Sequence, residues 1–225
     1  MKRVVLSSLV AGCVGAAFMS GCVSSGGSHT SGGKKMSAYY KDGQFDGKKA
    51  KQAYMDLMEE YDVPVYARMK TEDGFLWATD FSKGDFEAFG MGGVFWMNEP
   101  DGYLGHEIYL LPFQSIPEHR HLPTKFPAKM ESWTVKYGYV YGFSEVGEPN
   151  IDQFPEAKAK LSKLQVPHLN SLHVEIWRAD GHSHKLPKVE TWHFMMAGPK
   201  GAIVTETATF HDNDGLRFSV PGTKL

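Results

Sequence analysis

The feature that most limits how this chain can fold is a series of short, strand-like runs separated by Gly, Pro, Asn and Asp. Runs of this kind at short spacing predict a β-sandwich or β-barrel. The 14 Phe, 10 Tyr and 5 Trp fit this class, because aromatic side chains pack well on pleated surfaces. We therefore expect one mostly-β domain. The strand-like runs cover residues 92–97, 107–111, 132–141, 171–177 and 202–210.

The N-terminus has the pattern of an export signal. Lys2 and Arg3 precede an apolar run, residues 4–19, which is short for a membrane span but suits the core of a signal peptide. The run ends in Ser-Gly-Cys22, which resembles the bacterial lipobox, where the peptidase cuts before a cysteine whose sulfur is acylated. We predict a signal peptide over 1–21, lipidation at Cys22 and a lipid-anchored protein on the periplasmic or extracellular face of the cell envelope. An ordinary secretory peptide is the alternative.

The remaining chain divides into a tether and one folded domain. Residues 22–36 are rich in Ser and Gly without apolar periodicity, which predicts a flexible tether. The domain would occupy residues 37–225, beginning with an amphipathic helix over about 48–62, and residues 155–165 predict a shorter helical or loop insertion. A formal net charge of −2 without a basic cluster argues against nucleic-acid binding. Cys13 would leave with the signal peptide, so no disulfide is expected.

Two histidines have the spacing of metal ligands on a strand. His119 and His121 are two apart, so on a strand both imidazoles face one side and can reach one ion. The pattern His-x-His, a loop, Glu131 and then Gly138 resembles the first motif of the cupin family, whose two His and Glu bind metal. The resemblance implies a cupin barrel, a double-stranded β-helix or jelly roll.

A second motif supplies the fourth ligand. Gly181, Pro187 and the segment 191–193 resemble the second cupin motif, which assigns His193 as the remaining metal ligand. The other His-x-His pair, His182 and His184, stands in the turn-like segment 180–184, and we predict a solvated loop there.

Several segments resemble the D-lyxose ketol-isomerases within the cupins. They are residues 75–86, Lys-Met-Glu at 129–131, Thr-Trp-His at 191–193 and the closing segment 206–214, with Arg217 also in register. The resemblance implies a metal-dependent aldose–ketose isomerase for sugars such as D-lyxose and D-xylulose. It implies Lys129 and Glu206 as catalytic residues, and Asp212 and Arg217 as substrate-binding residues.

Each of these assignments has a structural alternative. Glu206 could orient a ligand histidine, Lys129 could be a solvated loop residue, and Asp212 could cap the turn 212–215. The loop before Glu131 is longer than in those isomerases, and His211 replaces a usual Asn, so the identity of the sugar stays open.

The ligand set indicates the class of metal. Three imidazoles and a carboxylate suit Mn, Fe or Zn better than Mg or Ca, and we expect Mn first, with Zn or Fe as alternatives. The expected partners are a small-molecule sugar and, through the lipid anchor only, the membrane; a homodimer is left open. Three other functions compete: a metal cupin that binds a sugar or sugar acid without turnover, an iron-dependent oxygenase, and a metal-free structural cupin.

Overall fold

The computed structural model describes residues 37–225. The predicted signal peptide, Cys22 and the tether over 22–36 lie outside the described residues. Within the described part, none of the helices combines the length and the apolar character that a membrane crossing requires.

Strands dominate the described chain, in agreement with the expected fold class. The helices are α1 (Gly47–Glu60), α2 (Ala67–Thr71) and α3 (Pro155–Lys160), with short 3-10 turns η1 (Ile151–Gln153), η2 (Val166–His168) and η3 (Asn213–Gly215). The strands are β1 (Tyr40–Lys41), β2 (Gln44–Phe45), β3 (Trp77–Thr79), β4 (Met91–Asn98), β5 (Leu104–Leu110), β6 (His119–His121), β7 (Glu131–Ser144), β8 (His173–Arg178), β9 (Ser183–Lys185), β10 (His193–Ala208) and β11 (Leu216–Phe218).

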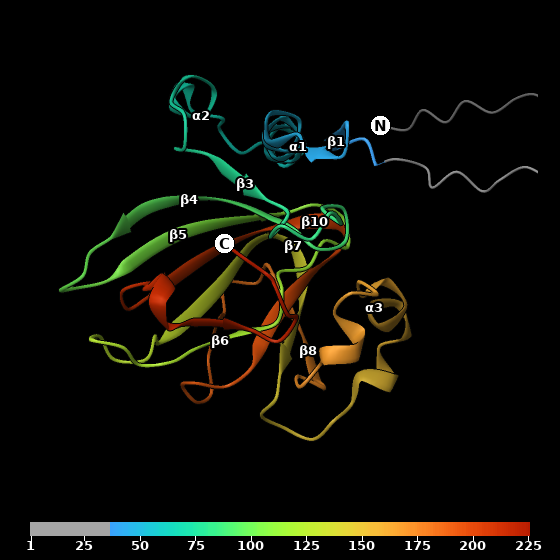
Figure 1. The fold of residues 1–225 in the computed structure, drawn as a ribbon, viewed down its shortest axis with the longest axis vertical. Coiled ribbons are helices and arrows are strands. Elements are labelled where there is room, and N and C mark those ends of the chain that lie inside the picture. Colours follow the sequence, from blue (N-terminus) through green and yellow to red (C-terminus); the bar gives the residue numbers. More distant parts are fainter. Residues whose placement is uncertain (1–36) are drawn as a thin grey trace, which may run out of the picture. The chain divides into compact units, whose positions relative to one another are not determined.

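A nine-stranded antiparallel sheet folds into the cupin barrel (Figure 1). One path runs β11-β6-β10-β5-β4-β3, and β7 pairs with β10, β8 and β9. The two long strands β7 and β10 pair from His193↔Ser144 to Ala208↔Glu131, so they run the length of the barrel together. The interior is a core that includes Ile108, Trp133, Val204 and other apolar side chains.

The strands β7 and β10 each change which alternate residues face inward. In the first half of β10, the odd-numbered residues Met195 and Ala197 face the inner core. After the irregularity between Ala197 and Ala202, the even-numbered residues Ala202 and Val204 face it instead. In β7, Trp133 and Val135 belong to the inner core, and after the irregularity between Val135 and Tyr137 it is Val140 that does. These paired irregularities allow both halves of each strand to line one interior.

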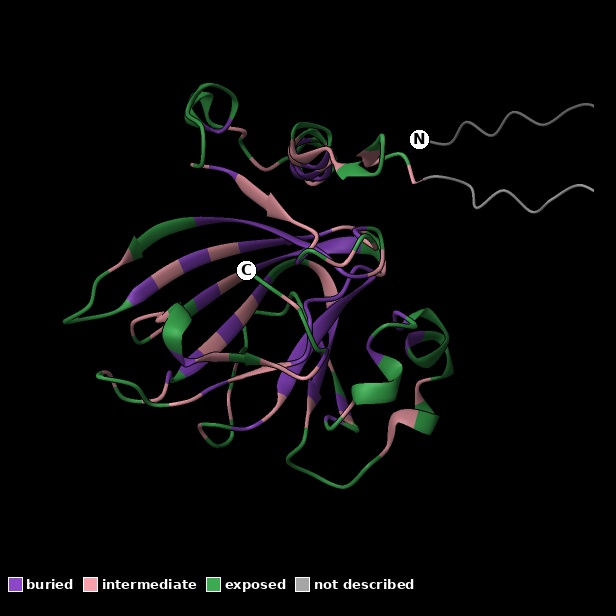
Figure 2. Cartoon of the chain, in the orientation of Figure 1, coloured by how far each residue is buried: buried purple, intermediate pink, exposed green. Residues whose placement is uncertain are grey.

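Helix α1 covers one face of the sheet. The Asp46 side chain caps its N-terminus by accepting a hydrogen bond from the Lys49 N–H. Ala50, Tyr54, Leu57 and Met58 recur at three and four residues and form the buried stripe seen in Figure 2. The helix predicted for 48–62 is therefore confirmed, and the structure has it at Gly47–Glu60.

The predicted insertion is a short helix, and it packs on another side of the barrel (Figure 1). Ala157 and Leu161 join a small apolar cluster with the outward-facing side chains of β7 and β10. The buried carboxylate of Glu118 holds the end of this segment, because it accepts hydrogen bonds from the backbone N–H groups of Asn170 and Ser171 at 2.8 and 2.6 Å.

One sequence-based expectation about local structure is wrong. His184 does not lie in a solvated loop: it belongs to β9, pairs with Trp133 in β7, and stacks on Trp177 with ring centroids 4.9 Å apart. His182 is exposed, as expected, and lies 3.1 Å from the Asp180 carboxylate. The β9–β7 pairing, which the short sequence Ser-His-Lys did not indicate, is the physical reason.

Candidate active site

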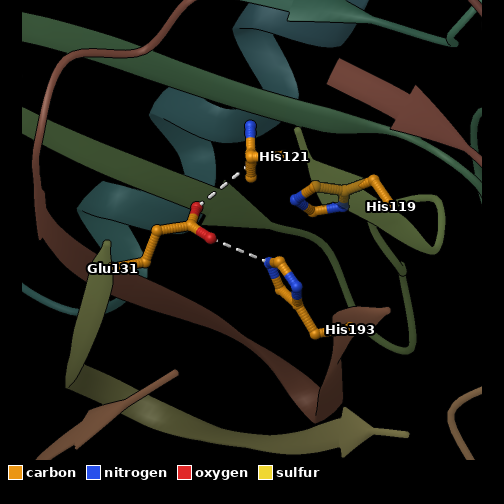
Figure 3. Close-up of side chains that lie close together, drawn as sticks. All are labelled: His119, His121, Glu131 and His193. Atoms are coloured by element: carbon orange, nitrogen blue, oxygen red, sulfur yellow. Dashed lines mark ion pairs between the residues drawn. The ribbon is translucent and has the colours of Figure 1, made fainter. Parts of the chain in front are cut away.

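Four side chains from three strands meet inside the barrel (Figure 3). His119 and His121 come from β6, Glu131 opens β7, and His193 opens β10, where it pairs with His119 across the strands. One ligand atom from each residue lies within 4.8 Å of the others. His121, Glu131 and His193 are buried, and His119 is partly exposed.

Backbone carbonyls fix which nitrogen of each imidazole is available. His119 Nδ1 lies 2.8 Å from the Pro117 carbonyl oxygen, and His193 Nδ1 lies 2.9 Å from that of Thr191. A carbonyl can only accept, so both Nδ1 atoms carry the hydrogen and both Nε2 atoms keep a lone pair. This is how protein surroundings commonly orient metal-binding histidines.

The protonation states of the group also suit a metal. Burial, together with the neighbouring imidazoles, holds the pKa of His119 well below its usual value, and burial lowers the pKa of His121. Burial alone would raise the pKa of Glu131, but the Lys129 ammonium and the two nearby imidazoles hold it well below its usual range. Burial alone would lower the pKa of His193, but the Glu131 carboxylate raises it. The site therefore offers neutral imidazoles at His119 and His121 beside an ionised carboxylate.

The buried polar atoms of the group test whether a metal fits. The Nε2 atoms of His121 and His193 lie 3.3 and 3.1 Å from Glu131 oxygens, yet neither has a hydrogen-bond partner among the described residues, and neither does Glu131 Oε2. Buried polar atoms are rarely left unpaired. Buried nitrogen and oxygen atoms that converge without hydrogen-bond partners are what a cation would satisfy, so the residues fit a divalent metal.

A second charged group adjoins these four residues. The Lys129 ammonium is 2.9 Å from Glu131 Oε1 and also donates to Glu206 Oε1. Glu206 lies on β10, and its Oε2 lies 2.9 Å from His106 Nδ1. Burial alone would raise the pKa of Glu206, but Lys129 and the hydrogen bond from His106 lower it to about 2. One buried network thus joins Lys129 and Glu206 to the candidate metal ligand Glu131.

A single cavity contains both groups. Its walls combine the polar side chains with aromatic rings. The lining residues include His106, His119, His121, Lys129, Glu131, His193, Glu206 and His211, together with Trp77, Phe95, Trp133 and Phe218.

Two of the sequence-predicted residues do not line this cavity. The Asp212 carboxylate accepts hydrogen bonds from the Thr124 hydroxyl and the Asp214 N–H, so it caps the turn at η3. Arg217 alternates with the cavity-lining Leu216 and Phe218 on β11, so its exposed guanidinium turns outward and donates to the backbone oxygens of Asp214 and Leu216.

Two titratable residues of the cavity were not predicted from the sequence. His211, noted only as a substitution, has its ring centroid 5.5 Å from that of His121, and its Nε2 lies 2.9 Å from Asn213 Oδ1. His106 was left without a partner. The alternation of His106, Ile108 and Leu110 could have shown that its side chain faces inward, but its pairing with Glu206 depends on the strand register.

Comparison with known proteins places this geometry in a family, although no family model matches the chain. The chain is 32% identical over 146 residues to the D-lyxose/D-mannose isomerase of Thermosediminibacter oceani, covering 64% of this chain and 76% of that protein. It is 33% identical over 143 residues to the D-lyxose ketol-isomerase of Cohnella laeviribosi, covering 63% and 74%.

Solved structures share the fold. The ligand-free L-ribose isomerase of Cellulomonas parahominis superposes with a TM-score of 0.61 at 15% identity, covering 79% of this chain and 92% of that one. The L-ribose isomerase of an Acinetobacter species, in complex with L-ribose, gives a TM-score of 0.57 at 17% identity, covering 72% and 79%. Given the sequence relatives, this chain belongs to the D-lyxose isomerase family and is an isomerase built on a cupin barrel.

Proposed function

We propose that this protein interconverts an aldose and a ketose, with D-lyxose and D-xylulose as the first substrate pair to test. The observation that carries the proposal is the placement of the four candidate metal ligands beside the Lys129–Glu206 pair in one cavity. The names of the sequence relatives support the choice of sugar.

The candidate ligands are His119, His121, Glu131 and His193, with Mn as the preferred ion and Zn or Fe as alternatives. A divalent ion held there would supply a Lewis acid that stabilises negative charge on the sugar oxygens. Backbone carbonyls already orient the His119 and His193 rings, so metal binding would require little rearrangement of these side chains.

The chemistry requires one proton to move between two carbons. The base removes the proton from C2 of the aldose, an enediol forms, and the same proton is delivered to C1, while the hydroxyl proton passes from O2 to O1. Glu206 is the proposed carrier, because its carboxylate is buried, ionised and in the cavity wall.

Lys129 is the proposed partner of the developing oxyanion. Its ammonium is buried and held by two carboxylates, so its charge is available without water around it. A sugar oxygen that draws a hydrogen bond from Lys129 would weaken the hold of Lys129 on Glu206. That exchange would raise the basicity of Glu206 at the moment when a base is needed.

The test combines metal analysis with proton exchange. Purified protein, loaded separately with Mn, Zn or Fe, is incubated with D-lyxose or D-xylulose in deuterated water. NMR follows the formation of the other sugar and the deuterium at C1 of D-xylulose or at C2 of D-lyxose. We expect interconversion with incorporation at or below one deuteron per turnover. Bound metal without interconversion of any pentose or hexose would contradict the proposal, and oxygen uptake with Fe would favour an oxygenase instead.

We further propose that the protein acts outside the cytoplasm, anchored to the membrane through Cys22 after removal of residues 1–21. The support is the charged start, the apolar run and the Ser-Gly-Cys motif of the sequence. Fractionation tests this: Cys22→Ala should leave an uncut precursor or release the protein into the soluble fraction. Unchanged processing and membrane retention would contradict the anchor.

A further inference from the structure

His106 is a buried, titratable side chain for which the proposed reaction has no role so far. It lies on β5 directly opposite Glu206 of β10 and is 3% exposed. Its Nδ1 is 2.9 Å from Glu206 Oε2. A carboxylate that is ionised can only accept, so Nδ1 carries a hydrogen and donates it to Glu206.

The two oxygens of Glu206 are therefore held by two donors on different strands. Lys129, just before β7, donates to Oε1, and His106 on β5 donates to Oε2. The terminal torsion of a glutamate is intrinsically broad, so the chain alone does not fix the plane of its carboxylate. The two donors together fix that plane, and His106 continues to hold Oε2 when Lys129 turns toward a substrate.

The imidazole of His106 is itself held rigidly. Its ring stacks with Phe95 at 4.3 Å and with Trp77 at 5.6 Å between centroids, with interplanar angles of 19° for both pairs. Gly93 leaves the space that the ring occupies, because a Cβ at that position would lie 2.4 Å from His106 Nε2. That Nε2 is buried without a hydrogen-bond partner among the described residues, so Glu206 is the polar contact that orients the ring.

We propose that His106 is a positioning residue of the isomerase, which donates its Nδ1–H to Glu206 and so sets the direction in which that carboxylate exchanges a proton with the sugar. The inference rests on the proposed role of Glu206. A misdirected base lowers the rate of proton transfer but leaves the sugar's other contacts intact, so kcat should change and KM should not.

Two substitutions separate the hydrogen bond from the packing of the ring. His106→Phe keeps a flat ring for Phe95 and Trp77 but has no donor, whereas His106→Asn keeps an N–H near the position of Nδ1 but loses the stacked ring. His184→Phe is the matched control, because His184 also stacks on a tryptophan, Trp177, yet does not line the cavity.

The experiment measures kcat and KM for D-lyxose with the metal-loaded enzyme, together with metal content and melting temperature. We expect His106→Phe to lower kcat roughly 10- to 100-fold with KM within a few-fold, the usual size of an effect on an orienting hydrogen bond. His106→Asn should recover most of that loss although it melts earlier, and His184→Phe should keep the kcat of the wild type.

Several results would overturn the inference. The first is a kcat for His106→Phe equal to that of the wild type. The second is a loss of kcat in His106→Asn as large as in His106→Phe, because that result would assign the effect to the packing of the ring. If His106→Phe does not fold, His106→Asn becomes the test. A kcat of His106→Asn more than tenfold below that of the wild type then overturns the proposal. A wild type that turns over no sugar overturns the proposed function and the inference together, whereas an active wild type beside an equally active His106→Phe overturns the inference alone.

Discussion

Replacing Lys129 with methionine tests the buried charge network most directly. The Lys129 side chain is almost fully buried, and its ammonium serves both Glu131 and Glu206. Methionine has a similar length and removes only the charge and the donors. The variant would leave two buried carboxylates without the cation that compensates them.

The size of the effect follows from the burial. Breaking a buried ion pair by removing one partner typically costs about 3–5 kcal/mol. The folded variant can reduce the penalty by protonating one carboxyl, and from an ordinary pKa of 4.5 this costs about 3.4 kcal/mol at pH 7 but only about 0.7 kcal/mol at pH 5. We therefore expect a loss of about 3–5 kcal/mol at pH 7 that shrinks by roughly 2–3 kcal/mol at pH 5.

Thermal unfolding followed by circular dichroism measures this loss. For a domain of this size, about 1 kcal/mol shifts the melting temperature by roughly 2–4 °C, so Lys129→Met should melt roughly 6–20 °C below wild type at pH 7 in the presence of a chelator. Saturating divalent metal should reduce the difference in melting temperature between the variant and the wild type, because a cation on Glu131 would replace part of the lost charge. Lys136→Met is the control, because Lys136 is an exposed lysine on β7, the strand that follows Lys129.

The reasoning would be refuted if Lys129→Met and the Lys136→Met control had the same melting temperature at pH 7 in the presence of a chelator. A large loss that is the same at pH 5 and pH 7 would also refute it, because uncompensated carboxylates must respond to pH.

Four further predictions concern the same domain. His193→Ala should weaken metal binding by at least tenfold in calorimetric titration, whereas His184→Ala should bind as the wild type does; equal losses would contradict the ligand assignment. Glu206→Gln should lower kcat roughly 10²- to 10⁴-fold with KM and metal content within a few-fold, and recovery of activity by excess metal would show a ligand-orienting role instead. Because the folded-state pKa of Glu206 is lowered to about 2 from 4.5, its stabilisation is complete above pH 4.5 and is lost as pH falls toward 2, so the melting temperature of Glu206→Gln should fall less steeply over that window than that of the wild type. A chain that begins at Ser37 should fold and bind metal as the full chain does, and failure to fold would show that the domain boundary is misplaced.

Local patterns in the sequence were enough to predict most of the elements. The helix α1 follows from apolar residues at three and four, and the strands β4, β5, β7, β8 and β10 follow from short runs between turn residues. The four candidate ligands could be named because His119, His121, Glu131 and His193 stand in recognisable spacing.

What could not be predicted depends on which residues face each other across strands. The pairing of Glu206 with His106 follows from the β10–β5 register, and the strand β9 at His184 follows from its pairing with β7. Arg217 was in register with the resembling family, but alternation along β11 points its side chain outward. Such facts arise from tertiary pairing, which no short pattern encodes.

The change of inward face within β10 has a consequence for engineering this enzyme. His193 shares its inward side with Met195 and Ala197, whereas Glu206 shares its inward side with Ala202 and Val204. One continuous strand therefore brings a candidate metal ligand and the proposed proton carrier to the same cavity. Inserting or deleting one residue within 198–201 would turn one of the two functions to the outside. Libraries that vary length to alter the sugar accepted should therefore leave that turn intact and target the loop over 122–127, which ends before Lys129 and whose length can change without reversing a strand face.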